Sequence, residues 1–264
     1  MHTVNTIEFP GYEDIKNNFN KYKDIFLEKQ IVAFRNANID FDMQTKIMHL
    51  LGDNLGWFPN SENPESSDYI EDHHKHMNSN NITTKDSIML GWHQEHIASE
   101  SGPLVSGLWN MTLFDCDPDT GKTYFVDMSK FYNNLPIEDQ LFLEKCKASV
   151  KIEDSLAFYD LVSLHWLTNE KVLRTYFDEE IIELFEFDGR EPLKIEKNKF
   201  NELSRHITSE VNFNENIRIQ HIWQKGDLLI TDLFKLSHAV SGGFNKNQRK
   251  LEGMFGKLKP WYKY

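Results

Sequence analysis

Three residues, His93, Glu95 and His238, have the side-chain types of a metal centre. His93 and Glu95 are two residues apart, and side chains at positions i and i+2 of a β-strand point to the same face. A second imidazole from a distant strand, that of His238, would complete a set of two histidines and one carboxylate. Such a set binds Fe(II) on one side and leaves the other side open for oxygen chemistry. The chain has 11 histidines and 41 acidic residues, so the surrounding sequence must support this interpretation.

Apolar segments flank His93, as expected for buried strands. The segment 87–92 runs directly into it, and the segment 103–111 follows after a short gap. Candidates for a substrate pocket in this region are Trp92, His96, Trp109 and Asn110. The strand parity of His96 is opposite to that of His93, so its side chain could instead face the core. Arg174, farther along the chain, is a candidate for binding a substrate carboxylate.

Arg249 lies eleven residues after His238 and is a candidate for binding an anion. Residues 241–248 are rich in turn formers, so the chain can reverse there and bring Arg249 back beside the metal. A guanidinium binds a carboxylate through two parallel hydrogen bonds, a geometry that lysine lacks. The alternative is an ordinary surface arginine beside Lys250.

The order and spacing of these motifs resemble the TauD/TfdA-like branch (taurine dioxygenase and clavaminate synthase-like enzymes) of the Fe(II)/2-oxoglutarate-dependent oxygenases. That family carries Trp-His-x-Asp/Glu, a strand with Gly-x-Thr, a Gly-Asp segment, a distal histidine and a downstream arginine. The resemblance covers residues 91–258, with a looser match over residues 28–35. Two positions depart from the common pattern. Glu95 replaces the commoner aspartate, and Leu233 and Phe234 stand where the family often has Asn-Arg.

The resemblance implies a role for each site residue. His93, Glu95 and His238 would bind Fe(II), and Arg249 and Thr123 would bind the far carboxylate of the cosubstrate 2-oxoglutarate. It also implies that O2 and 2-oxoglutarate are consumed, that succinate and CO2 are released, and that a small molecule is hydroxylated. The glutamate ligand and the acidic, aromatic-rich composition favour an amino acid or related zwitterion as the substrate.

Other functions share these sequence features. A desaturase or ring-forming oxidase on the same scaffold would use the same ligands, and the mass of the product would distinguish it. A non-catalytic jelly-roll module for binding or sensing is a second alternative, although the intact ligand set and Arg249 argue against it. A cupin-like enzyme that uses a metal without 2-oxoglutarate is a third, and it would make Arg249 dispensable.

Size and composition limit the possible classes of protein. The 264 residues and 31.1 kDa fit one large domain over residues 1–264. The net charge of −12 argues against nucleic acid, whose binding needs clustered Lys and Arg. No apolar run has membrane-spanning length, and no signal peptide is expected at residues 1–5. The two cysteines, Cys116 and Cys146, are too few for a disulfide framework, so we predict a reducing, cytoplasmic setting.

Hydrophobic periodicity predicts an α+β fold with a mainly β core. The predicted helices are 12–29, 41–51 (with Gly52 as the stop), 136–147 and 197–209. The predicted strands are 30–34, 87–95, 104–115, 122–127, 217–224, 226–233 and 249–258, with mixed strands over 161–187. Many strands flanked by helices indicate a double-stranded β-helix, which is a form of jelly roll.

Residues 54–85 are polar and rich in turn formers, so we predict a long loop that acts as a lid or active-site loop. Within it, His73, His74 and His76 form a polar cluster. A Zn or Ni site there is an alternative to a solvated loop, but no cysteine or regular ligand spacing supports it.

Overall fold

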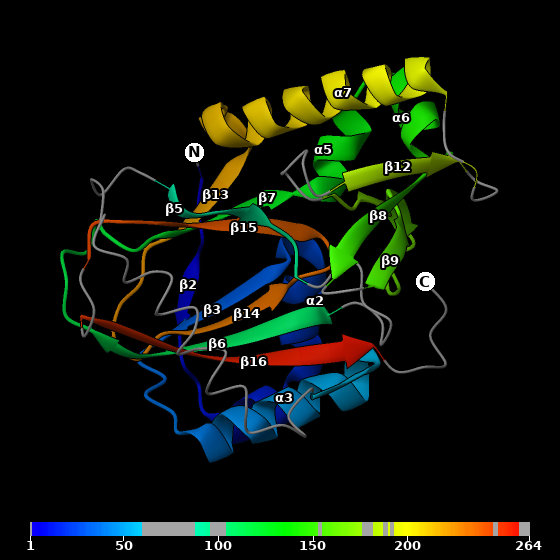
Figure 1. The fold of residues 1–264 in the computed structure, drawn as a ribbon. Helices are drawn as coiled ribbons and strands as arrows, with labels where there is room; N and C mark the ends of the chain where they lie inside the picture. Colours follow the sequence, from blue (N-terminus) through cyan, green and yellow to red (C-terminus); the bar gives the residue numbers. More distant parts are fainter. Residues whose placement is uncertain are drawn as a thin grey trace.

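The computed structural model of the chain describes residues 2–59, 88–95, 104–152, 155–175, 182–186, 190, 193–244 and 248–258. Two β-sheets form its centre, and helices cover their outer faces (Figure 1). Among the residues described, no helix is both long and apolar enough to cross a membrane. The architecture is therefore α+β and rich in sheet, as the sequence predicts.

The first sheet contains the strand that carries His93 and the strand that carries His238. Its order is β1 (His2–Thr3), β13 (Arg218–His221), β7 (Thr123–Asp127), β15 (Leu236–Ser241) and β5 (Ile88–His93). Strand β15 pairs antiparallel with both β5 and β7, and His238 lies directly opposite His93. The pairing therefore brings together two histidines that are far apart in the sequence.

The second sheet faces the first across a shared apolar core. Its order is β2 (Thr6–Glu8), β3 (Ile31–Arg35), β14 (Leu228–Asp232), β6 (Leu104–Phe114), β16 (Arg249–Leu258) and β4 (Trp57–Pro59). Met111 of β6 packs in one cluster with Phe125 of the first sheet, whereas Leu108 packs in the cluster that contains Ile47 and Met48 of a helix. Strand alternation thus separates the inner face of this sheet from its helix-covered outer face.

Two smaller sheets and the helices complete the fold. One small sheet has the order β12 (Ile182–Glu186), β8 (Cys146–Ile152) and β9 (Ser155–Asp160), and the other pairs β10 (Val162–Leu164) with β11 (Lys171–Leu173). The helices are α1 (Tyr12–Asn17), α2 (Phe19–Lys29), α3 (Phe41–Leu55), α5 (Met128–Asn134), α6 (Ile137–Leu143) and α7 (Lys194–Phe213), with a short 3-10 helix at Glu215–Ile217. Helix α3 lies below the second sheet, and α5, α6 and α7 lie above the first (Figure 1).

Two predicted helices differ from those in the structure, one by a break and one by its end. The helix predicted over 12–29 is broken at Asn18, whose side-chain amide donates to Asp14 (2.9 Å). The helix predicted to stop at Gly52 instead continues to Leu55. Gly52 lies inside this helix, at a position where a Cβ would be 2.5 Å from the carbonyl oxygen of Trp57. The glycine therefore permits close packing, and the left-handed Gly56 ends the helix.

Two further segments correct the sequence-based prediction. The helix predicted over 136–147 ends at Leu143, because the chain from Cys146 onward pairs as β8 with β9 and β12. The loop predicted over 54–85 begins too early, since residues 54–59 finish α3 and form β4. The rest of that loop, including His73, His74 and His76, lies outside the described residues.

Candidate metal centre

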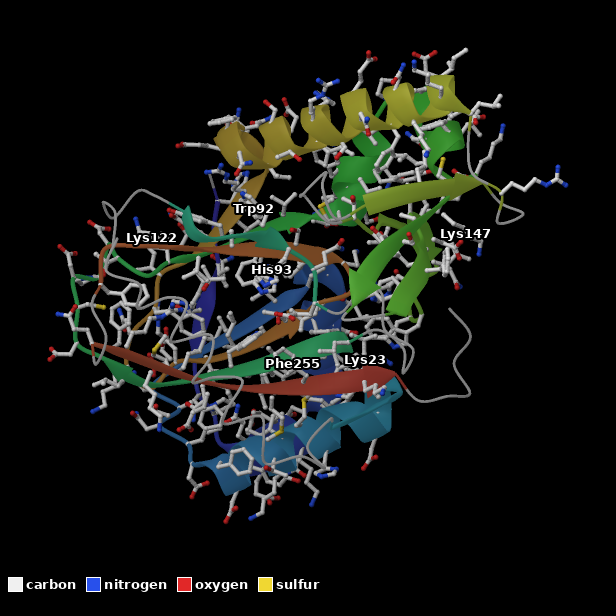
Figure 2. The ribbon with its side chains drawn as sticks, viewed as in Figure 1. Lys23, Trp92, His93, Lys122, Lys147 and Phe255 are labelled. Carbon is white, nitrogen blue, oxygen red and sulfur yellow. The ribbon has the colours of Figure 1, made fainter. Side chains whose placement is uncertain are left out.

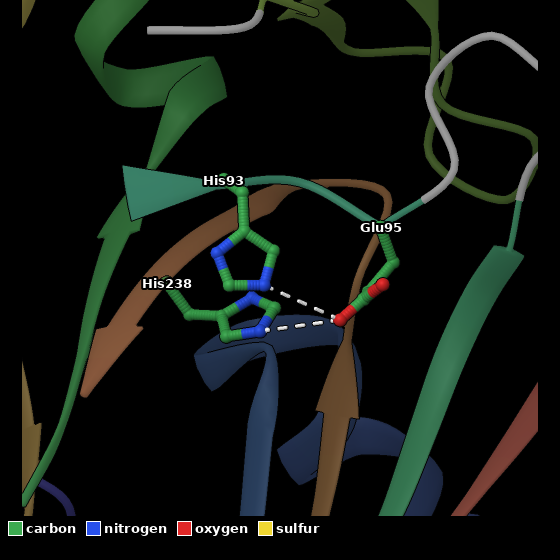
Figure 3. A group of neighbouring side chains, drawn as sticks. All are labelled: His93, Glu95 and His238. Carbon is green, nitrogen blue, oxygen red and sulfur yellow. Dashed lines mark ion pairs between the residues drawn. The ribbon is translucent and has the colours of Figure 1, made fainter. Parts of the chain in front are cut away.

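His93, Glu95 and His238 converge on one point (Figure 3). One carboxylate oxygen, Oε1 of Glu95, lies 3.4 Å from Nε2 of His93 and 3.5 Å from Nε2 of His238. One potential ligand atom from each residue lies within 4.8 Å of the other two. Within the described part of the chain, no other group of three His, Cys, Asp or Glu side chains meets this criterion. These three side chains could hold a metal ion.

Local hydrogen bonds orient the two imidazoles. Nδ1 of His93 lies 2.8 Å from the carbonyl oxygen of Gly91 and can donate to it, which leaves Nε2 to bind a metal. The hydroxyl of Ser237 donates to the backbone carbonyl of His93 (3.1 Å), beside the strand pair that places His238. Glu95 lies two residues beyond the end of β5, in a turn.

Burial and charge make this group electrostatically coupled. Burial lowers the pKa of His93, but the nearby Glu95 carboxylate and the Gly91 carbonyl outweigh it, so the pKa is raised overall. Burial raises the pKa of Glu95, but hydrogen bonds and charge from His238 and His93 hold it well below its usual value. Glu95 and His238 are buried, while the side chain of His93 is 22% exposed. An ionised carboxylate between two imidazoles matches the donor set of an Fe(II) centre with one accessible side.

Aromatic side chains surround the metal centre. Phe125 and Trp109 lie 6.2 Å and 6.4 Å from His238, measured between ring centroids. Trp109 also packs edge-on against Phe255 of β16 (5.1 Å), which comes from the sheet facing His93 (Figure 2). A Cβ on Gly253 would be 2.7 Å from the indole of Trp109, so the glycine makes room for this ring. The side chains described here around the metal centre are therefore mainly apolar.

Arg249 is a buried cation at the start of β16. It is 4% exposed, and none of its three guanidinium nitrogens has a hydrogen-bond partner in the described structure. The guanidinium lies over the rings of Phe244 (5.2 Å) and Trp223 (5.9 Å). Burial lowers the pKa of Arg249 to about 10. Burying an unpaired charge is costly, so the site fits an anionic ligand.

Thr123 shares an aromatic neighbour with Arg249. Its hydroxyl oxygen accepts a hydrogen bond from the indole N–H of Trp223 (2.9 Å), so its own proton can be donated elsewhere. His238 pairs with Phe125, and Thr123 is two residues away on the same face of β7, roughly 7 Å along the strand. A short dicarboxylate could span this separation.

Three of the predicted substrate-pocket residues contact groups other than His93, Glu95 and His238. The indole of Trp92 lies 5.5 Å from the guanidinium of Arg218, which donates to Val211 of α7 on the outer side of the first sheet. Asn110 donates to the carbonyl of Ile39 (2.8 Å). Arg174 is buried over the ring of Phe234 (4.0 Å). Of the two other candidates, Trp109 lies beside His238 (6.4 Å between ring centroids), and His96 lies outside the described residues.

The sequence interpretation missed several buried polar residues close in the chain to the candidate ligands or in contact with such residues. Gln94, between two of the ligands, is 1% exposed and hydrogen-bonded to distant segments. Asp232 lies 2.9 Å from the buried His165. The position of Gln94 between His93 and Glu95 was a usable signal. No local pattern indicated His165.

Known proteins resemble this chain both in sequence family and in fold. The family described as "Taurine catabolism dioxygenase TauD, TfdA family" matches residues 3–255. A taurine dioxygenase from Burkholderia xenovorans has a similar fold, with a TM-score of 0.66 and 15% identity over 97% of this chain and 88% of that one. AAD-2 in complex with Mn(II) and N-oxalylglycine gives a TM-score of 0.65 and 14% identity over 98% of this chain and 95% of that one.

No curated protein matched the sequence closely enough to serve as a relative. The family match covers most of the chain, and this family acts on small molecules. The chain therefore belongs to the TauD/TfdA family and is a 2-oxoglutarate-dependent dioxygenase that uses Fe(II), 2-oxoglutarate and O2.

Proposed function

We propose that this dioxygenase hydroxylates an amino acid or related zwitterion and releases succinate and CO2. In this proposal His93, Glu95 and His238 bind Fe(II), and Arg249 and Thr123 bind the far carboxylate of 2-oxoglutarate. The observation that carries the cosubstrate site is the buried guanidinium of Arg249, which lacks a hydrogen-bond partner among the described residues. A carboxylate is the ligand that a guanidinium binds best.

We also propose that the two sheets form a double-stranded β-helix within a single domain over residues 1–264. The shared core cluster of the two sheets supports this, since it joins Phe125 and Leu236 of one sheet to Met111 and Leu229 of the other. The family match over residues 3–255 supports a single domain.

Fe(II), when bound, supplies the oxygen activation that protein side chains cannot perform. The residues of the chain have other roles. The three ligands hold the metal and leave coordination positions open, and Arg249 orients the cosubstrate toward them. Trp109, Phe125 and the other apolar groups exclude water from the metal centre, which strengthens every charge interaction inside it.

The substrate class is testable by a screen. The purified enzyme with Fe(II), ascorbate and 2-oxoglutarate is mixed with amino acids and other zwitterions, and in parallel with sulfonates and phosphonates. We expect a zwitterion to stimulate succinate release most. Stimulation by sulfonates or phosphonates alone would contradict the proposed substrate. The product should gain one oxygen atom, whereas loss of two hydrogens would indicate the desaturase or ring-forming alternative.

Glu95 also predicts the type of product. In halogenating relatives a small residue replaces the carboxylate ligand and frees a coordination position for chloride. Glu95 fills that position here, so we expect no chlorinated product in chloride buffer. Mass spectrometry of the product formed in chloride and in chloride-free buffer tests this. A chlorinated product from the unmodified enzyme would show that Glu95 is not a ligand during turnover.

A further inference from the structure

Gln94 joins the metal-binding segment to two distant parts of the chain. It lies between His93 and Glu95, and its side chain is 1% exposed. Its Nε2 donates to the carbonyl of Phe234 (3.3 Å), and its Oε1 accepts from the backbone N–H of Thr175 (3.2 Å). Both ends of the buried amide are therefore bound to backbone groups. These groups belong to Phe234 and Thr175, and they remain when the side chains of those residues change.

Strand pairing positions His93 but does not extend to Glu95. The ladder between β5 and β15 runs only as far as His93, opposite His238. Glu95 follows two residues later in a turn. The side chain of Gln94 supplies an attachment at this point, where the sheet no longer constrains the chain.

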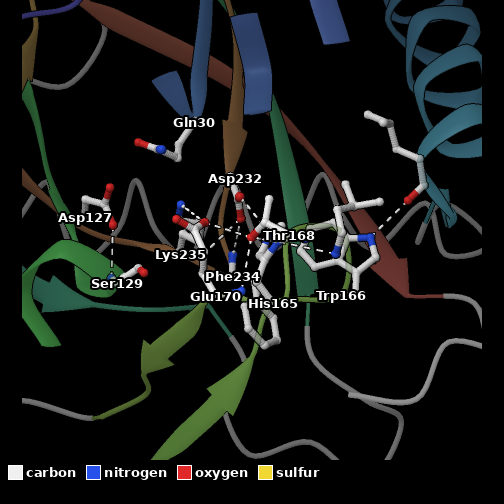
Figure 4. Close-up of polar contacts among 12 residues, drawn as sticks. Gln30, Asp127, Ser129, His165, Trp166, Thr168, Glu170, Asp232, Phe234 and Lys235 are labelled. Atoms are coloured by element: carbon white, nitrogen blue, oxygen red, sulfur yellow. Dashed lines mark hydrogen bonds and ion pairs between the residues drawn. The ribbon is translucent and has the colours of Figure 1, made fainter. Parts of the chain in front are cut away.

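The turn that Gln94 contacts leads into the third ligand. Oδ1 of Asp232 accepts from the N–H groups of Phe234 (3.1 Å) and Lys235 (3.0 Å), and Oδ2 lies 2.9 Å from Nε2 of the buried His165 (Figure 4). His238 follows three residues after Lys235. Gln94 thus connects the segment that carries His93 and Glu95 to a turn with several hydrogen bonds, and this turn leads to His238.

The same turn is held from a second direction. The guanidinium of Arg174 lies 4.0 Å from the ring centroid of Phe234 and donates to its carbonyl (3.4 Å). Glu170 accepts from the ammonium of Lys235 (2.7 Å), which is 3% exposed. The carbonyl that receives Gln94 therefore belongs to a peptide with several independent contacts, which makes it a fixed point of attachment.

We propose that Gln94 is a positioning residue of the metal centre. Its two hydrogen bonds fix Glu95 so that one carboxylate oxygen faces both His93 and His238. This inference rests on the proposed metal ligands. Without the amide, Glu95 can move relative to the imidazoles, so Fe(II) binding should weaken even in a protein that folds normally.

The test compares two glutamines that are equally buried. Gln94→Met removes the amide and keeps a side chain of similar length. Gln44→Met is the matched control, because Gln44 is also buried and donates to the carbonyls of Leu108 and Glu252 (both 3.0 Å) on the outer side of the second sheet. Fe(II) affinity is measured by anaerobic titration of each protein, and thermal unfolding is measured without metal.

We expect Gln94→Met to weaken Fe(II) binding by roughly tenfold, the lower end of what lost support of ligands costs. Gln44→Met should destabilise the fold but leave Fe(II) affinity within about twofold, because distant sites act independently. Gln94→Glu, which keeps an acceptor for Thr175, serves as the second variant if Gln94→Met does not fold. It should retain more affinity than a variant that lacks both bonds.

Two results would overturn this inference. One is wild-type Fe(II) affinity in folded Gln94→Met or, only if that variant does not fold, wild-type Fe(II) affinity in Gln94→Glu. The other is an equal loss of affinity in Gln44→Met, which would mean that any core destabilisation weakens the site. If the wild-type protein itself bound no Fe(II), the proposed ligands would be wrong and this inference would fail with them.

Discussion

His93→Ala and His238→Ala should each abolish the weak visible charge-transfer band that Fe(II) and 2-oxoglutarate give in this family. In the absence of oxygen, the wild-type protein should show the band once both are added. Each imidazole supplies one of three protein ligands, and Oε1 of Glu95 lies within 3.5 Å of both. Removing one leaves two ligands, too few to hold the metal and the chelating cosubstrate in a defined geometry.

The anaerobic absorption spectrum of each variant measures this effect. His206→Ala is a suitable control, because His206 is an exposed residue of α7 outside the cluster. It should retain the full band. A band of unchanged intensity in either His93→Ala or His238→Ala would mean that the metal binds elsewhere.

The sequence predicted which three residues form the metal centre, from the spacing of His93 and Glu95 and from the family motif. The predicted strand 87–95 ends at His93 in the structure, and Glu95 lies in a turn, so strand parity was the wrong reason for expecting these two side chains together. The motif around His238 indicated the third residue. The structure brings these three together, and Arg249 and Thr123 meet around Trp223. The spacing of His93 and Glu95 and the family motif were enough to identify these residues.

The support of the centre could not be predicted, because it depends on contacts between distant segments. Gln94 binds backbone groups 81 and 140 residues away. The early end of α6 has a similar cause, since β8 is defined by pairing with β9 and β12. Helix α3 is different, because its Gly52 packs closely against Trp57, only five residues away, and the left-handed Gly56 ends the helix.

Phe234 accounts for part of the departure from the common family pattern. Its ring is packed by Trp166 (5.7 Å) and His165 (5.6 Å) and carries the guanidinium of Arg174. Where the family often has an arginine, this chain places an aromatic ring, and the guanidinium of Arg174, the residue after β11, lies over it. Phe234, which replaces the usual arginine, is therefore in contact with an arginine from another segment. A local sequence comparison could not reveal this contact.

Arg249→Ala should raise the apparent KM for 2-oxoglutarate by roughly tenfold to a hundredfold. The guanidinium is 4% exposed, and its nitrogens lack hydrogen-bond partners in the part of the chain described. A charge-assisted pair with the cosubstrate in such a site contributes about 2–3 kcal/mol, and each 1.4 kcal/mol is about a factor of ten. Arg249→Lys should recover only part of the loss, because an ammonium lacks the planar fork.

Arg218→Ala is the matched control for Arg249→Ala. Arg218 is also a buried arginine over aromatic rings, but it donates to the carbonyl of Val211 (3.0 Å) behind the first sheet. Its loss should lower the thermal stability and leave the KM for 2-oxoglutarate within about twofold. Fe(II) binding without cosubstrate should change little in Arg249→Ala, because Arg249 is not a ligand in the proposed site.

The decisive comparison is the 2-oxoglutarate titration of the wild type against Arg249→Ala. If Arg249 holds the far carboxylate, the two curves separate while the Fe(II) affinities agree, because the arginine acts on the cosubstrate alone. If the curves overlay, another group binds that carboxylate, and the role proposed for Arg249 is wrong. If Fe(II) affinity and KM change together, the substitution has disturbed β16 as a whole, and its effect on KM would not reflect a lost carboxylate contact.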